Sequence, residues 1–259
     1  MEFNLSDKII VITGATQGVG EAIARTAAGA KAKGLCLAGR NRERGEKIAV
    51  ELTNNGCPTI FVPTELEKEG DCRSLMAKAQ QRFGLVNGLV NAAALSERGT
   101  IEDTSIALWD KLFSINARAP FILMQEFTRS LKKTKQPGSI VNIITISSHG
   151  GQPYITAYCS SKGALAILTK NVAHALRYDK IRVNGINMGW CDTPGENIIQ
   201  QKTGQPSDWL RIAEEKQPFG RLLKPKDVAL LAVYLLSDSS EMMTGSLIDF
   251  DQNVIGSYE

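Results

Sequence analysis

Apolar, strand-like runs alternate with helix-like segments from one end of the chain to the other. Alternation of this kind implies a parallel sheet with helices on both faces. We therefore expect an α/β fold: a single-domain, Rossmann-like, doubly wound parallel sheet of about seven strands with helices on both faces. The predicted strands are 8–13, 34–39, 58–62, 86–91, 138–146, 180–186 and 245–250. The predicted helices are 18–32, 41–54, 68–83, 105–132, 153–178 and 224–237.

The chain has no linker, repeat or low-complexity stretch within its 259 residues. We therefore expect one dinucleotide-binding and catalytic domain over residues 1–259. The longest irregular region, about 192–223, carries several prolines and glycines around a short amphipathic piece at Trp209–Ile212. It leaves the sixth predicted strand at its carboxyl end, where ligands bind in open α/β sheets, so we interpret it as a substrate lid.

Charge and cysteine usage exclude several classes of partner. The net charge is +3 with no long Lys/Arg block, which argues against nucleic acid. The five cysteines are scattered, odd in number and without a Cys-x-x-Cys pair, which favours reduced thiols in the cytoplasm and no metal site. The first residues lack the pattern of a secretory signal, and no apolar run approaches the roughly 18 residues that cross a bilayer.

A glycine cluster with the spacing G-x-x-x-G-x-G lies between the first predicted strand and the first predicted helix. Gly14 can make a tight turn, Gly18 lets the backbone approach a pyrophosphate, and Gly20 lets helix and strand pack closely. The helix N-terminus then offers amide donors to phosphates. A glycine turn alone is weak support for a nucleotide site, because many loops contain one.

Tyr158 and Lys162 place a phenol and an amine four residues apart, on one face of a predicted helix. A nearby ammonium stabilises phenolate and lowers the pKa of the tyrosine. The pair is then a plausible general acid/base. In isolation, Tyr-x-x-x-Lys also occurs by chance in many helices.

Together, the two motifs resemble the short-chain dehydrogenase/reductase family, and the match runs along nearly the whole chain. Further matching segments, in order, are Leu89–Ala94, Asn116, Gly138–Ile143, Ile181–Asn184, Gly189–Pro194, Pro225 and Thr244–Ser246. Ala92 and Ala94 depart from the family's Asn-Asn-Ala-Gly, while Asn91 is retained.

The resemblance implies a catalytic set of Asn116, Thr145, Tyr158 and Lys162. Tyr158 gives or takes the proton, and Lys162 lowers its pKa and binds the nicotinamide ribose. Asn116, at an irregular point of its helix, holds a water that links Lys162 to solvent. Thr145 stands where the family has serine and keeps a hydroxyl for the developing oxyanion. Ser147 is a rival, because it points to the same side if the strand continues.

The resemblance also implies a nicotinamide cofactor. The second predicted strand ends at Gly39-Arg40, with no carboxylate before Glu43. An NAD site usually places an acid there, whereas a guanidinium suits a phosphate, so we expect NADP(H) rather than NAD(H). The alternative is that Arg40 lies in a surface loop. The expected cofactor-binding residues are Gly14, Thr16, Gln17, Gly18, Val19, Arg40, Glu65, Leu66, Asn91, Tyr158, Lys162, Gly189 and Thr193.

The expected function is an NADP(H)-dependent oxidoreductase that interconverts an alcohol and a carbonyl on a small polar molecule. The polar lid favours a polyol, sugar or hydroxy acid, and Ser147, His149 and Trp190 are substrate-contact candidates. One alternative is 3-oxoacyl-thioester reduction. Another is a catalytically silent NADP(H)-binding sensor or interaction protein. The resemblance implies a homotetramer or homodimer, with no membrane or nucleic-acid partner.

Overall fold

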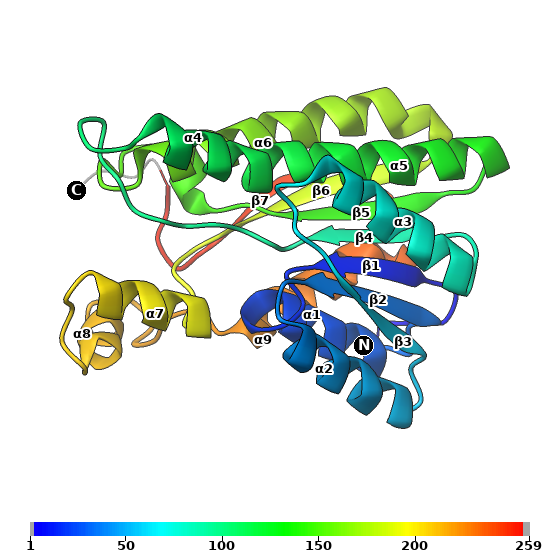
Figure 1. Cartoon of the computed structure of the whole chain (residues 1–259), viewed down its shortest axis with the longest axis horizontal. Coiled ribbons are helices and arrows are strands. Elements are labelled where there is room, and N and C mark those ends of the chain that lie inside the picture. Colours follow the sequence, from blue (N-terminus) through cyan, green and yellow to red (C-terminus); the bar gives the residue numbers. More distant parts are fainter. Residues whose placement is uncertain (1–2, 256–259) are drawn as a thin grey trace.

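The computed structural model describes residues 3–255, so the ends of the expected domain, residues 1–2 and 256–259, lie outside the described chain. Seven parallel strands form one sheet in the order β3-β2-β1-β4-β5-β6-β7. The fold class predicted from the alternating pattern is confirmed (Figure 1). The strands are β1 (Ile9–Thr13), β2 (Gly34–Gly39), β3 (Thr59–Pro63), β4 (Gly88–Asn91), β5 (Gly138–Ile143), β6 (Ile181–Met188) and β7 (Leu247–Phe250).

Helices cover both faces of the sheet (Figure 1). On one face lie α1 (Gly18–Gly29), α2 (Arg42–Asn54) and α9 (Pro225–Leu236), and on the other lie α3 (Glu69–Phe83), α5 (Ala119–Thr134) and α6 (Thr156–Leu176). The short α4 (Ile106–Phe113) precedes α5. Two further helices, α7 (Pro194–Lys202) and α8 (Trp209–Glu215), stand apart beyond one end of the sheet.

Alternating side chains of each strand enter two separate hydrophobic layers. In β1, Ile10 and Ile12 pack with α1 and α9, whereas Ile9 and Val11 pack with α3 and α5. Successive strand residues point to opposite faces, so a run apolar at every position is required when both faces are covered. This explains the unbroken branched apolar run Ile9–Ile12.

The strand order reverses between β1 and β4. The chain proceeds outward from β1 through β2 to β3, then returns so that β4 pairs on the other side of β1. The connections that leave the carboxyl ends of β1 and β4 diverge at this point, which opens a crevice there. The sequence motifs therefore converge on one edge of the sheet.

The largest differences from the sequence predictions concern three parts of the chain. The region 192–223, expected to be largely irregular, contains α7 as well as the amphipathic α8. The helix predicted over 105–132 is interrupted by a π-helical turn at Ser114–Arg118. The strand predicted to reach residue 146 ends at Ile143, so Ser147 lies in a 3-10 turn, Ile146–His149, and not on a continuing strand. Within residues 3–255, no helix combines the length and apolarity that a membrane span requires.

Candidate active site

A cleft of about 550 Å³ opens at the carboxyl edge of the sheet, between the glycine loop, the start of α6 and the helix α7. Its walls bring together residues from five separate parts of the sequence. Of the predicted site residues, those that line it are Gln17, Gly18, Val19, Thr145, Ser147, Tyr158, Lys162, Gly189, Trp190 and Thr193. Those that lie outside its lining are Gly14, Thr16, Arg40, Glu65, Leu66, Asn91, Asn116 and His149.

The glycine loop is shaped by positions that tolerate no side chain. Gly14 has φ +68°, and a Cβ there would meet the Ala93 Cα at 2.8 Å. A Cβ on Gly20 would meet the Gly14 carbonyl oxygen at 2.4 Å, so Gly20 allows α1 to begin directly above the loop. Gly18 has φ +58° and faces Thr193 across the cleft. The geometry of Gly14 and Gly20 agrees with the tight turn and the close packing predicted for them, and the approach of a pyrophosphate at Gly18 stays a prediction.

The start of α1 fits a dinucleotide phosphate. The N-cap residue Gln17 makes no side-chain cap, so no side chain occupies the first-turn amides of this 12-residue helix. Gly18, Val19 and Gly20 line the cleft at that turn. Unpaired helix amides and the positive end of the helix dipole bind phosphate, so the residues present suit a dinucleotide cofactor.

Tyr158 and Lys162 both line the cleft from α6. Lys162 is 2% exposed and donates from Nζ to the Ile143 carbonyl oxygen at 2.8 Å. Burial lowers the pKa of Lys162 to about 8. Burial also raises the pKa of Tyr158, while a hydrogen bond with the Thr145 side chain acts in the opposite direction. The net shift of the Tyr158 pKa is upward, with burial its largest cause, so the lowering of that pKa by Lys162 stays a prediction.

Thr145 directly adjoins the tyrosine. Its side chain acts to lower the pKa of the Tyr158 phenol, and its hydroxyl donates to Ser147 Oγ at 3.2 Å. Thr145 also caps the 3-10 turn by accepting from the Ser147 amide. The Ser147 hydroxyl donates to Gln152 Oε1 at 2.8 Å. Both hydroxyls reach the cleft, but Thr145 makes the contact with Tyr158.

Two predicted asparagines lie beneath the cleft. Asn116, in the π-helical turn, donates to the Leu95 carbonyl and to Ser161 Oγ, both at 2.9 Å, and accepts from the Leu95 amide. It thereby ties the segment after β4 to α6. Asn91 donates to Asn142 Oδ1 at 2.8 Å, while its own Oδ1 is buried with no partner among the described residues.

The expected adenosine side of the site lies on the open edge beyond β2 and β3. Arg40 is exposed directly after Gly39, and Glu65 follows the end of β3 with its carboxylate 2.7 Å from Lys68 Nζ. Arg44, in the first turn of α2 and not singled out from the sequence, donates from Nη1 to Gln17 Oε1 at 2.9 Å. Its position four residues after Arg40 is a sequence signal that indicates a second cation at this corner.

The helix α7 closes one side of the cleft. Thr193 caps it by accepting from the Glu196 amide at 3.1 Å. Glu196, also missed as a site residue, accepts from Trp190 Nε1 at 2.9 Å. Trp190 and Trp209 stack with their ring centroids 5.8 Å apart. His149 turns away from this wall, with Nε2 2.9 Å from Asp249 Oδ1.

Known proteins resemble this chain in sequence over nearly its whole length. The sequence profile of a family described as enoyl-(acyl carrier protein) reductase matches residues 14–252. The NADP-dependent (R)-specific alcohol dehydrogenase of Lentilactobacillus kefiri is 32% identical, over 95% of this chain and 96% of that protein. Carbonyl reductase (NADPH) 2 of Sus scrofa is 30% identical, over 99% of this chain and all of that protein.

Structural similarity extends over the same length. A short-chain type dehydrogenase/reductase from Mycobacterium marinum superposes with a TM-score of 0.89 at 26% identity, covering 99% of this chain and 98% of that one. The superposed part of the chain includes the sheet, the glycine loop and the helix that carries Tyr158 and Lys162. The chain is an oxidoreductase of the nicotinamide-dependent kind and belongs to the short-chain dehydrogenase/reductase family.

Proposed function

We propose that this protein is an NADP(H)-dependent oxidoreductase that interconverts an alcohol and a carbonyl on a small polar substrate. The observation that carries the proposal is that Thr145, Tyr158 and Lys162 line one wall of a cleft that the glycine loop also lines. Lys162 lines the same cleft and is almost wholly buried.

The side chains of this chain supply the proton chemistry. A nicotinamide cofactor, when bound at the α1 N-terminus, supplies or accepts the hydride. In the direction of reduction, Tyr158 transfers its proton to the carbonyl oxygen as the carbon gains the hydride, which gives the alcohol. Its raised pKa keeps that proton in place at neutral pH. The Thr145 hydroxyl donates to the same oxygen, and the Lys162 ammonium stabilises the phenolate left behind. Asn116 is proposed to hold the water through which Lys162 exchanges protons with solvent.

Three observations support NADP(H) over NAD(H). Arg40 follows β2 directly, with no carboxylate at that corner. Arg44 is held against the glycine loop by Gln17, so two guanidiniums are available for a ribose phosphate. The names of the two relatives, from Lentilactobacillus kefiri and Sus scrofa, specify NADP or NADPH.

Initial rates with NADPH and NADH test this preference. We expect NADPH to give at least about tenfold higher kcat/KM, since a charged hydrogen bond contributes roughly 1.5–3 kcal/mol. Arg40→Asp should reverse the preference and Arg44→Ala should weaken it. Arg42→Ala is the matched control, because Arg42 Nε is bonded to Glu46 along the exposed face of α2. A wild-type enzyme that prefers NADH contradicts the proposal.

We further propose that residues 192–223, with α7 and α8, form the substrate lid. Glu196, Gln200 and Gln205 line the cleft from this region, which favours a polyol, sugar or hydroxy acid over an apolar substrate. A homotetramer or homodimer is supported by Phe121, which is 47% exposed on α5 while the three residues after it are buried. A cytoplasmic location is supported by five cysteines without a disulfide.

NADPH oxidation against a panel of sugars, diketones, hydroxy ketones and acyl thioesters tests the reaction class. Turnover confined to the hydroxylated carbonyl compounds is the expected result. Turnover of acyl thioesters alone would replace the proposal with thioester reduction. NADPH binding without turnover of any compound would favour a sensor.

A further inference from the structure

An arginine and a glutamate from separate parts of the chain line the cleft side by side. Arg98 follows β4, and Glu196 lies in the first turn of α7. Arg98 Nη2 and Glu196 Oε1 are 4.0 Å apart, and the two side chains are 29% and 19% exposed. That separation is too long for a direct hydrogen bond, so both groups retain capacity toward the cleft they line.

The backbone holds Arg98 in register with the catalytic helix. The Gly99 amide donates to the Tyr154 carbonyl at 2.9 Å, and the Thr156 amide donates to the Gly99 carbonyl at 3.0 Å. The guanidinium carbon of Arg98 lies 5.6 Å from the centroid of the Tyr154 ring, an arrangement that fixes its direction. Arg98 makes no hydrogen bond with any residue of the described chain, so its N–H donors remain open to a ligand.

Only one of the two carboxylate oxygens of Glu196 accepts hydrogen bonds within residues 3–255. Its Oε1 accepts from Trp190 Nε1 at 2.9 Å and from Gln200 Nε2 at 2.5 Å. Its Oε2 has no partner within residues 3–255. The carboxylate is close enough to Tyr158 to contribute to the raised pKa of the phenol, after the larger effect of burial. Glu196 and the predicted proton donor Tyr158 both line the cleft.

The charges of this pair select the kind of group that can lie beside them. A substrate carboxylate at Arg98 would lie close to the Glu196 carboxylate and be repelled. An ammonium beside Glu196 would be repelled by Arg98 in the same way. A hydroxyl accepts from a guanidinium and donates to a carboxylate, so it satisfies both groups without adding charge.

We infer that Arg98 and Glu196 select neutral substrates that carry a hydroxyl on the carbon next to the reacting one. The preferred class is then α-hydroxy ketones and the vicinal diols formed from them, in preference to hydroxy acids. This inference rests on the proposed alcohol–carbonyl interconversion and narrows its substrate class.

Matched substrates test the selection kinetically. We expect kcat/KM for 1-hydroxy-2-butanone to exceed that for 2-butanone and for 2-oxobutanoate by at least about tenfold. Arg98→Met and Glu196→Ala should each reduce the ratio between the hydroxy ketone and the plain ketone by about tenfold. Glu196→Gln should reduce it less, because the amide keeps an acceptor. Arg211→Met is the control and should leave the ratio unchanged, since Arg211 pairs with Asp208 and Glu215 on the exposed side of α8.

A binding measurement separates selection from turnover. Tryptophan fluorescence of the NADP⁺-loaded protein can follow 1,2-butanediol and 2-butanol, because Trp190 donates to Glu196 and stacks on Trp209. We expect the diol to bind at least about tenfold more tightly, and Glu196→Ala to remove the difference.

The outcomes distinguish the two proposals. Equal kcat/KM and equal binding for the hydroxylated and plain compounds overturn the inference. So does a preference for 2-oxobutanoate that Arg98→Met abolishes, because Arg98 would then bind a carboxylate. Selective, Glu196-dependent diol binding without turnover of any carbonyl compound supports the selection by this pair and contradicts the proposed oxidoreductase function.

Discussion

The two ends of the parallel sheet carry cavities of almost equal size, about 550 Å³ at the carboxyl edge and about 560 Å³ at the amino edge. Each has a cationic side chain in its wall, Lys162 at the first and Arg182 at the second. Only the carboxyl edge has the arrangement of an active site. The difference lies in how fully the polar groups of each edge are already bonded.

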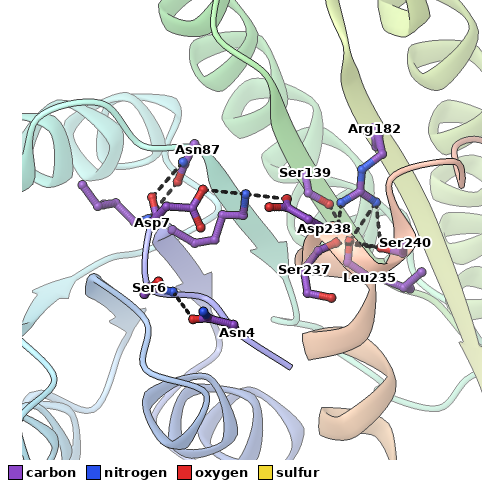
Figure 2. A network of polar contacts seen from close by, with 12 residues as sticks. Asn4, Ser6, Asp7, Asn87, Ser139, Arg182, Leu235, Ser237, Asp238 and Ser240 are labelled. Atoms are coloured by element: carbon purple, nitrogen blue, oxygen red, sulfur yellow. Dashed lines mark hydrogen bonds and ion pairs between the residues drawn. The ribbon is translucent and has the colours of Figure 1, made fainter. Parts of the chain in front are cut away.

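At the amino edge the polar groups satisfy one another (Figure 2). Arg182 donates to the carbonyls of Leu235 and Ser237 and to Ser240 Oγ, each at 3.0 Å. Two of these acceptors lie at the C-terminal end of α9, so the arginine completes the helix terminus. Lys8 is likewise bonded to carboxylates on both sides, at Asp7 and Asp238.

At the carboxyl edge several polar groups keep unused hydrogen-bonding capacity within residues 3–255. Lys162 has a single acceptor, the Ile143 carbonyl, among the described residues. The first turn of α1 has no side-chain cap, and Asn91 Oδ1 is buried without a partner. Buried polar groups are normally paired, and of these groups Lys162 and the first turn of α1 line the cleft, whereas Asn91 lies outside its lining. Cavity volume alone does not distinguish the two edges, whereas unpaired donors and acceptors do.

The largest effect is expected from Tyr158→Phe. This change removes the proton donor but keeps the ring in place, so kcat should fall at least about 10²-fold. Binding of NADPH, measured by fluorescence titration, should change little because the phenol is not at the phosphate end. A variant that retains more than a tenth of wild-type kcat would show that another group carries the proton.

Arg182→Met tests the opposite edge. The carbonyls at the end of α9 lose their charged donor, so the free energy of unfolding should fall by about 2 kcal/mol. Activity per folded molecule should not change. The matched control is Arg177→Met. Arg177 lies in the wall of the same cavity but caps only the exposed end of α6, so its loss should lower the free energy of unfolding by less than about 0.5 kcal/mol. Urea denaturation measures both; equal costs would mean that Arg182 is no better paired than a surface arginine.

The alternating pattern predicts the sheet and the two motifs predict the candidate site, but the sequence does not predict that residues 194–202 of the lid form a helix. The branched apolar runs of β1 to β6 and the glycine spacing carry local signals that tertiary contacts reinforce. The sequence does not predict α7, because Pro194 and Gly195 are also typical of a loop. Proline is favoured at the first position of a helix, and Thr193 with Glu196 three residues later has the capping pattern that begins one.

Other features depend on packing that no local pattern encodes. The strand containing Ile143 ends where Thr145 turns its hydroxyl back to cap the next turn, which moves Ser147 off the strand. The pKa of Tyr158 depends on how completely the surrounding helices exclude water, and the spacing to Lys162 does not reveal that. Arg98 and Glu196 meet only because α7 folds over the segment that follows β4.

Thr145→Val and Ser147→Ala compare the two hydroxyls of the carboxyl edge. Valine removes the Thr145 hydroxyl and with it one donor for the oxyanion, so kcat should fall by about tenfold or more. Ser147→Ala should lower kcat by less than about threefold, because its hydroxyl is directed to Gln152. Steady-state kinetics on both variants measure the difference. The reverse order would assign the oxyanion contact to Ser147.

The pH dependence should reflect the buried lysine. With the pKa of Lys162 lowered to about 8, the ammonium is present below that pH and is lost as the pH rises through it. The rate of carbonyl reduction should therefore be about fourfold lower at pH 8.5 than at pH 7. Alcohol oxidation, which releases a proton, should not decline over this range and serves as the control. A reduction rate that stays constant to pH 9.5 would mean that Lys162 keeps its ordinary pKa.

The smallest effect is expected from Asp7→Asn at the amino edge. Lys8 is 13% exposed in its side chain, but Asp7 and Asp238 are 62% and 74% exposed, so water screens both pairs. The two carboxylates raise the pKa of Lys8 even though burial lowers it, and removing one of them leaves the other in place. We therefore expect the unfolding free energy to change by less than about 0.5 kcal/mol in urea denaturation at low ionic strength. A loss above about 1.5 kcal/mol would show that this edge depends on its ion pairs, and that the backbone bonds of Arg182 are not what distinguishes it from the catalytic edge.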